Sequence, residues 1–223
     1  MAIAFDAATN AQGNSASSLT YAHTVSGSDR VLYVLFWAFD SVSVSAPSGV
    51  TYAGVSMTKI AEQVYGVASR QNMSVWRLIA PTTGSNNVVI TCPGTQAELN
   101  GTALSYTGVD QTTSEGTAVT AASNSGTATV DVTSVASGEV VVGGVGEFNR
   151  TLTVGAGQTQ RSYVSNGGGN DTTMTSDESG TGTVTHSYTL SSAQGWGIAA
   201  WAVKPAAGGG GGGFTPKGLW FTR

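Results

Sequence analysis

Alternating apolar and polar residues predict β-strands along most of this chain. Residues 18–25 read SLTYAHTV, with a large side chain at every second position and mostly short polar residues between them. Residues 73–79 alternate in the same way. Residues 30–40 read RVLYVLFWAFD and are apolar on both faces. This pattern predicts a central strand that is covered on both sides.

Further short runs rich in β-branched and aromatic residues predict more strands, at residues 50–60, 87–92, 99–106, 127–132, 139–145, 160–164, 183–190 and 196–204. Ala53-Gly54 divides the first of these runs, and glycine supplies the positive φ that a tight hairpin needs. No segment shows a convincing 3.6-residue period, and no internal repeat of fixed period is visible. We therefore expect an all-β fold, an antiparallel, jelly-roll-like β-sandwich, in one domain over residues 1–205.

Composition narrows the class of protein. Only 10% of the 223 residues are charged, glycine accounts for 31 of them, and the net charge is −4. Nucleic-acid binding through a basic surface is not expected, because phosphate neutralisation needs clustered Lys and Arg. A soluble helical protein is not expected either, because exposed helix faces need the charged residues that are scarce here. The 40% hydrophobic content is enough to build a core.

Targeting signals and membrane segments are not evident. The first residues, MAIAFD, lack the basic and apolar regions of a signal peptide. The longest apolar stretch, residues 31–39, is far shorter than the roughly 20 residues that cross a bilayer. We expect a chain made in a cytoplasm and not inserted in a membrane.

Candidate catalytic groups are few. The chain has no G-x-S-x-G motif and two histidines, His23 and His186, which we expect to be satisfied by hydrogen bonds within the fold. Glu147 follows an apolar run and is the least easily dismissed carboxylate, but we expect it at the rim of the sandwich. Cys92 closes an apolar strand and is expected to be an inert core thiol. We predict no enzymatic activity.

Candidate ligand sites are equally sparse. Trp37, Trp76, Trp196 and Trp201 could stack on sugars, although three of them lie in apolar strands where a core position is favoured. Residues 166–171 and the pair Asp177-Glu178 offer oxygen ligands for Ca²⁺, but the D-x-D-x-D-G spacing is missing. We predict no cofactor.

The composition changes abruptly after Pro205. Six glycines, residues 208–213, precede a segment with four large apolar side chains, Phe214, Leu219, Trp220 and Phe221. Polyglycine has the highest backbone entropy and cannot hold a fold alone. Residues 206–223 therefore read as an extended glycine-rich tether that ends in an apolar, partner-binding anchor. A frayed tail is the alternative.

Several motifs together resemble a poorly characterised family of β-sandwich modules, jelly-roll or immunoglobulin-like, that occurs in phage genomes and in large bacterial surface proteins. The motifs are residues 18–25, 49–59, 76–91, 103–113, 154–159 and 201–205. The resemblance covers about residues 3–205. It implies a fold and a setting, with no catalytic residues to carry over.

Three functions follow as hypotheses. The first is a structural protein of a phage virion, a capsid decoration or a fibre or appendage subunit, that contacts copies of itself and other virion proteins through its sandwich edges and its C-terminal segment. The second is a carbohydrate- or surface-binding module for a cell-surface glycan, which predicts exposed coplanar aromatics at one end. The third is a glycan hydrolase or lyase, which predicts two facing carboxylates in a groove.

Overall fold

The computed structural model describes residues 1–66, 70–165 and 171–207, and their regular structure consists of β-strands alone. The first sheet contains β1 (Ala4–Val25), β2 (Val31–Phe39), β3 (Gly49–Tyr52), β4 (Val55–Ser56), β5 (Thr58–Tyr65), β6 (Gln71–Ile79) and β7 (Gly84–Thr107). The second contains β8 (Val119–Val135), β9 (Val140–Phe148), β10 (Leu152–Val154), β11 (Thr159–Ser165), β12 (Asp171–Ser179) and β13 (Gly182–Val203). All pairing is antiparallel, which confirms the predicted all-β antiparallel sandwich. The described residues include no helix that could cross a membrane.

Strand β2 is the central strand that its apolar pattern predicts. It lies between β6 and β7, and all of its residues except Phe39 are buried. The predicted hairpin at Ala53-Gly54 is also confirmed, because these residues join β3 to β4 with φ values of 50° and 78°. Two pairs of predicted strands are single long strands instead. Residues 87–92 and 99–106 both belong to β7, and residues 183–190 and 196–204 both fall in β13, apart from residue 204.

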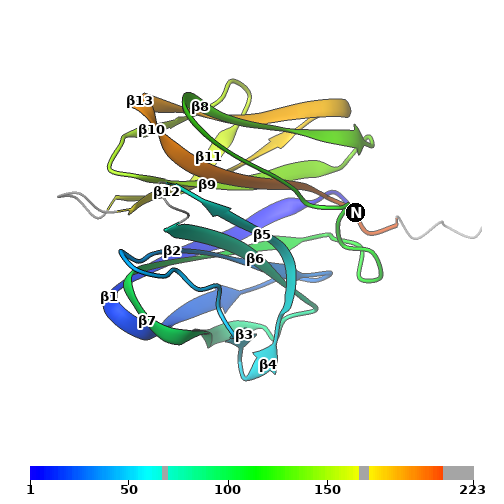
Figure 1. The fold of residues 1–223 in the computed structure, drawn as a ribbon. Helices are drawn as coiled ribbons and strands as arrows, with labels where there is room; N and C mark the ends of the chain where they lie inside the picture. The colour runs from blue at the N-terminus through cyan, green and yellow to red at the C-terminus, as the bar shows by residue number, and fades with distance from the viewer. Residues whose placement is uncertain (67–69, 166–170, 208–223) are drawn as a thin grey trace, which may run out of the picture.

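The long strands build a central core and an outer core on each sheet, that of the second sheet in two clusters. A central core lies between the two sheets, where Tyr33, Leu35 and Trp37 of β2 meet Val142, Ala199 and Trp201 of the second sheet. Each sheet also folds over an outer core of its own, because the far ends of its long strands turn back across it. Figure 1 shows the resulting stack, with β8, β10 and β13 at the top, β9 and β12 below them, and β2, β6, β7 and β3 beneath.

The two sheets share one topology. In the first, β2 pairs with β6 and β7, while β7 also pairs with β1 and β3, and β5 pairs with β6. In the second, β9 pairs with β12 and β13, while β13 also pairs with β8 and β10, and β11 pairs with β12. Strand β4 alone has no equivalent. The molecule is therefore a structural duplication, and we call residues at equivalent ladder positions counterparts.

Counterparts meet across the central core. Gln71 and its counterpart Asp171 open β6 and β12, and Gln71 Nε2 donates a hydrogen bond to Asp171 Oδ1 at 2.9 Å. Trp37 lies over its counterpart, Gly146, where an added Cβ atom would be 2.2 Å from Trp37 Cδ1. Leu35 covers Gly144 in the same way, with 2.5 Å between the added Cβ and Leu35 Cδ2. The contacts of Trp37 and Leu35 thus each pair a large side chain with a glycine.

The two sheets meet at two seams without hydrogen-bonded ladders between them. At one seam β1 lies beside β11, and Ser162 Oγ donates to Asn10 Oδ1 at 2.9 Å. At the other, β5 lies beside β8 and β13. The described strands therefore approach a closed barrel, and the seams are where its surface is open.

Candidate functional site

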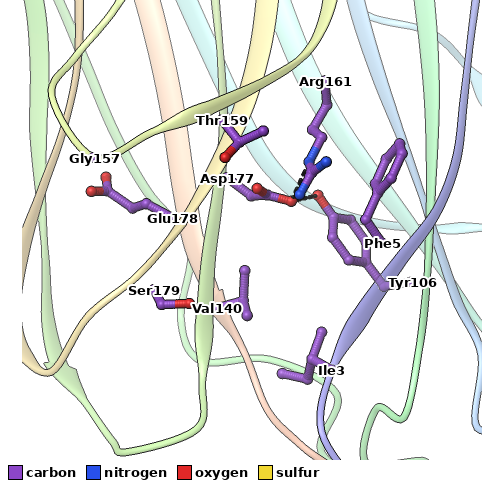
Figure 2. Close-up of a pocket in the computed structure, with 10 residues that line it drawn as sticks. All are labelled: Ile3, Phe5, Tyr106, Val140, Gly157, Thr159, Arg161, Asp177, Glu178 and Ser179. Carbon is purple, nitrogen blue, oxygen red and sulfur yellow. Dashed lines mark hydrogen bonds and ion pairs between the residues drawn. The ribbon is translucent and has the colours of Figure 1, made fainter.

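A polar hollow lies at the β1–β11 seam. It has a volume of about 350 Å³, and its walls come from β1, β7, β9, β11 and β12. We call it the seam groove, and Figure 2 shows its lining: Ile3, Phe5, Tyr106, Val140, Gly157, Thr159, Arg161, Asp177, Glu178 and Ser179.

A charged cluster forms one wall of the seam groove. Asp177 Oδ2 accepts hydrogen bonds from Arg161 Nε at 2.7 Å and from Tyr106 Oη at 2.9 Å. The Arg161 guanidinium also lies 4.3 Å from the centre of the Phe5 ring. Burial raises the pKa of Tyr106 well above its usual value, and the negative charge of Asp177 raises it further. The charges of this wall are therefore satisfied by one another, as the dashed contacts in Figure 2 show.

The second acid of the groove points elsewhere. Asp177 and Glu178 are neighbours on β12, so their side chains leave opposite faces of the sheet. Glu178 Oε1 is instead 2.9 Å from Nδ1 of His186. Figure 2 shows the Glu178 side chain turned away from Arg161 and Tyr106. The two carboxylates do not face one another as glycoside hydrolysis would require.

Beneath Glu178, His186 belongs to a relay with the geometry of a nucleophile, base and orienting acid. Ser176 Oγ lies 3.0 Å from His186 Nε2, opposite the contact of Nδ1 with Glu178. Both Ser176 and His186 are fully buried, and Ser176 Oγ donates a hydrogen bond to Tyr188 Oη. A substrate has no access to this hydroxyl, so the relay works as an internal hydrogen-bond network. The prediction that His186 is satisfied within the fold is confirmed.

His23 is satisfied in a similar way on β1. Its Nδ1 lies 3.0 Å from Thr9 Oγ1, and its Nε2 lies 3.1 Å from Ser105 Oγ. Burial lowers the pKa of His23 to about 4, and the charge of Asp6 opposes that shift only in part. The ring is therefore neutral near pH 7, and the prediction of a satisfied core histidine is confirmed.

Three carboxyl groups lie buried near the other end of the sandwich. Asp171 and Glu147 are fully buried, and burial raises their pKa values to about 8 and about 7. Burial also raises the pKa of Glu98, whose Oε2 accepts a hydrogen bond from the backbone N–H of Asp171 at 2.8 Å. The expectation that Glu147 is a rim carboxylate is wrong. Its counterpart is Ala38 of β2, a position that both neighbouring strands cover.

The candidate Ca²⁺ ligands do not converge in the described structure. Residues 166–170 lie outside the described residues. The three acids of this set contact other side chains instead. Gln71 donates a hydrogen bond to Asp171, Arg161 donates to Asp177, and His186 lies against Glu178. Among the described residues, no group of three or more His, Cys, Asp or Glu side chains could hold a metal ion.

The four tryptophans that could have stacked on sugars are all core residues. Trp37 and Trp201 are fully buried, Trp196 is 4% exposed and Trp76 is 8% exposed. Cys92 is also buried, and burial raises the pKa of its thiol to about 11, so the prediction of an inert core thiol is confirmed.

The predicted anchor residues, Phe214, Leu219, Trp220 and Phe221, lie outside the described residues. Sequence reasoning missed the seam groove, because its lining comes from five strands and one of them, β12, has no apolar alternation. No known protein family, curated protein or solved structure matches this chain.

Proposed function

We propose that this chain is a structural protein of a phage virion, a capsid decoration or a fibre or appendage subunit. It assembles with copies of itself and with other virion proteins through its sheet edges and its C-terminal segment. The observation that carries this proposal is that the charged groups of the seam groove satisfy one another. Such a groove suits the docking of a protein segment better than the transformation of a substrate.

The surface of the described strands supports the same reading. The exposed large hydrophobic residues of the strands, Val55, Val64 and Tyr163, lie on three different strands, and Met1 and Val42 lie outside the strands. A glycan-binding module would instead need exposed aromatic side chains that share one plane. Tyr163, at 37% exposure, is the one aromatic in this exposed set.

Mass spectrometry of virions purified from cells that produce this chain tests the proposal. We expect the chain at a fixed stoichiometry relative to the major capsid protein. Its absence from intact particles would refute the virion assignment.

A variant in the full-length chain tests the role of the C-terminal segment. Each large aromatic side chain that becomes buried in an interface contributes about 1.5–3 kcal/mol. Trp220→Ala should therefore leave the fold unchanged by circular dichroism and reduce incorporation into particles at least tenfold. Val55→Ala, which truncates an exposed side chain on β4, is the matched control. Full incorporation of Trp220→Ala would contradict the anchor role.

A further inference from the structure

The chain leaves the described structure beside one end of the seam groove. The backbone N–H of Ala206 donates to the carbonyl of Gly108 at 2.8 Å, and the amino group of Met1 donates to the carbonyl of Ala206 at 3.0 Å. These contacts tie Ala206 to the first residues of the chain, and Ala2 and Ile3 line the adjoining hollow. The described chain therefore ends close to the groove.

The seam groove continues into that second hollow, which has a volume of about 450 Å³. The two share Ile3, Val140 and Ser179, and we call them together the seam channel. Ile3, Phe5 and Val140 give the channel apolar contact surface. Three glycines, residues 138, 157 and 180, line it without side chains and leave the backbone accessible.

The charge of the channel complements that of the C-terminal segment. Three acids, Glu139, Asp177 and Glu178, line the channel with one cation, Arg161, which is paired with Asp177. The Met1 amino group lies at the end of the channel, so Glu139 and Glu178 leave a net negative charge there. Residues 208–223 contain Lys217 and Arg223 and no acidic side chain. The same segment carries its apolar side chains close to these cations, so both kinds of group can contact the channel together.

The glycine run gives the segment behind it a limited reach from Ala207. Six extended residues cover at most about 20 Å. A flexible linker of this length keeps its attached segment at millimolar effective concentration near the point where the linker begins. Docking within one chain is therefore favoured over capture by a second copy at ordinary protein concentrations.

We propose that residues 214–223 dock into the seam channel of their own chain in the free subunit. The docked segment covers Leu219, Trp220 and Phe221, which would otherwise form an exposed apolar patch. This inference rests on the proposed function, in which the segment is the assembly anchor. The channel keeps the anchor covered until a neighbouring subunit offers a better partner.

Cysteine cross-linking in the full-length protein tests where the segment lies. In the variant Ser179→Cys/Thr222→Cys, mild oxidation should give an intramolecular disulfide in most molecules, seen as a monomer with altered non-reducing mobility. The control Thr51→Cys/Thr222→Cys places the first cysteine on β3, away from the channel, and should give at least fivefold less product. Native Cys92 is buried and does not compete.

Tryptophan quenching gives a second readout that needs no cross-link. Four of the five tryptophans are buried. The difference in acrylamide quenching between the parent protein and Trp220→Phe therefore measures the exposure of Trp220. Ile3→Asp should raise the Trp220 quenching constant at least threefold, whereas Val55→Asp on the exposed β4 should leave it unchanged. Near-ultraviolet circular dichroism checks that each variant is folded. If Ile3→Asp unfolds the protein, the cross-linking experiment alone tests whether the segment docks.

Each outcome bears on the proposal. A disulfide-linked dimer would show that a second copy supplies the segment, and it would overturn docking within one chain. Equal cross-linking in the control, together with a fully exposed Trp220 in the parent protein, would overturn docking altogether. An intramolecular cross-link in a protein that is absent from virions would refute the proposed function and leave the docking intact.

Discussion

Replacing Asp171 with asparagine is expected to remove a loss of stability that ionisation of this buried carboxyl group causes as the pH rises. Asp171 is fully buried and accepts a hydrogen bond from Gln71, while its Oδ2 atom has no hydrogen-bond partner among the described residues. Asparagine keeps the shape and the acceptor atom that faces Gln71. The substitution therefore changes the charge and little else.

The size of the effect follows from the shift in pKa. Burial raises the pKa of Asp171 from 3.8 to about 8. The folded protein therefore binds this proton more tightly than the unfolded chain, and each pKa unit corresponds to about 1.4 kcal/mol. The stabilising contribution is complete below pH 3.8 and is lost as the pH rises towards 8. Between pH 4 and pH 7 the loss amounts to about 4 kcal/mol.

Glu147 adds a smaller effect of the same sign. Its pKa rises from 4.5 to about 7, so its contribution is also lost as the pH rises through this range. The loss is about 3 kcal/mol when the group is fully ionised. Burial of Glu98 adds a loss of the same sign, whereas His23, with its pKa lowered from 6.5 to about 4, gains stability as the pH rises. Asp171→Asn should remove the Asp171 contribution and leave the other three in place.

Urea unfolding followed by tryptophan fluorescence, repeated from pH 4 to pH 8, measures the effect. The unfolding free energy of Asp171→Asn relative to the parent should increase by about 4 kcal/mol between pH 4 and pH 7. Asp40→Asn is the control. Hydrogen bonds from the backbone N–H groups of Val42 and Ser43 lower the pKa of Asp40, so its effect should appear only as the pH falls towards acid values. Parallel pH profiles for Asp171→Asn and the parent would refute the reasoning.

Three further predictions concern packing and reactivity. Gly146→Ala places a Cβ atom 2.2 Å from Trp37. It should reduce the unfolding free energy by about 1–3 kcal/mol and lower the melting temperature by several degrees. Gly126→Ala, which has open space around it, should leave the melting temperature unchanged. Equal melting temperatures for the two variants would contradict the packing described. Cys92 should react with a thiol reagent only at the rate of unfolding, and rapid labelling of the native protein at pH 8 would show that it is not a core thiol. Arg161→Met removes the cation of the seam groove and should lower the unfolding free energy in urea by about 2 kcal/mol, and an unchanged midpoint would show that the cluster is not stabilising.

The parts of the fold that sequence patterns predicted are those with strong apolar signals. Strand β2 is apolar at nearly every position, and the Ala53-Gly54 hairpin has a residue that tolerates positive φ. Strand β12 gave no such signal, because it reads DTTMTSDES and is nonetheless buried along most of its length. Ser176, for example, donates a hydrogen bond to Tyr188 in the outer core of the second sheet. Only the tertiary structure decides which polar residues of β12 become covered.

The repeated topology was also invisible in the sequence, for a geometric reason. Val31 and its counterpart Val140 are 109 residues apart, whereas Gln71 and Asp171 are 100 residues apart. The loops between equivalent strands differ in length in the two sheets. Counterparts are therefore not separated by one constant number of residues, and the sequence shows no repeat of fixed period. The buried position of Glu147 follows from this topology, and so it could not be read from the residues that flank Glu147.

The glycines opposite Leu35 and Trp37 carry a consequence for the evolution of the molecule. Had the two halves been identical subunits of a dimer, each residue near the twofold axis would have met its own copy, with two indoles colliding or two glycines leaving a hole. A single gene that encodes both halves escapes that constraint, because one copy can keep the bulky residue while the other loses its side chain. The contacts of Leu35 with Gly144 and of Trp37 with Gly146 are of this asymmetric kind, which separate identical polypeptides could not form at the axis.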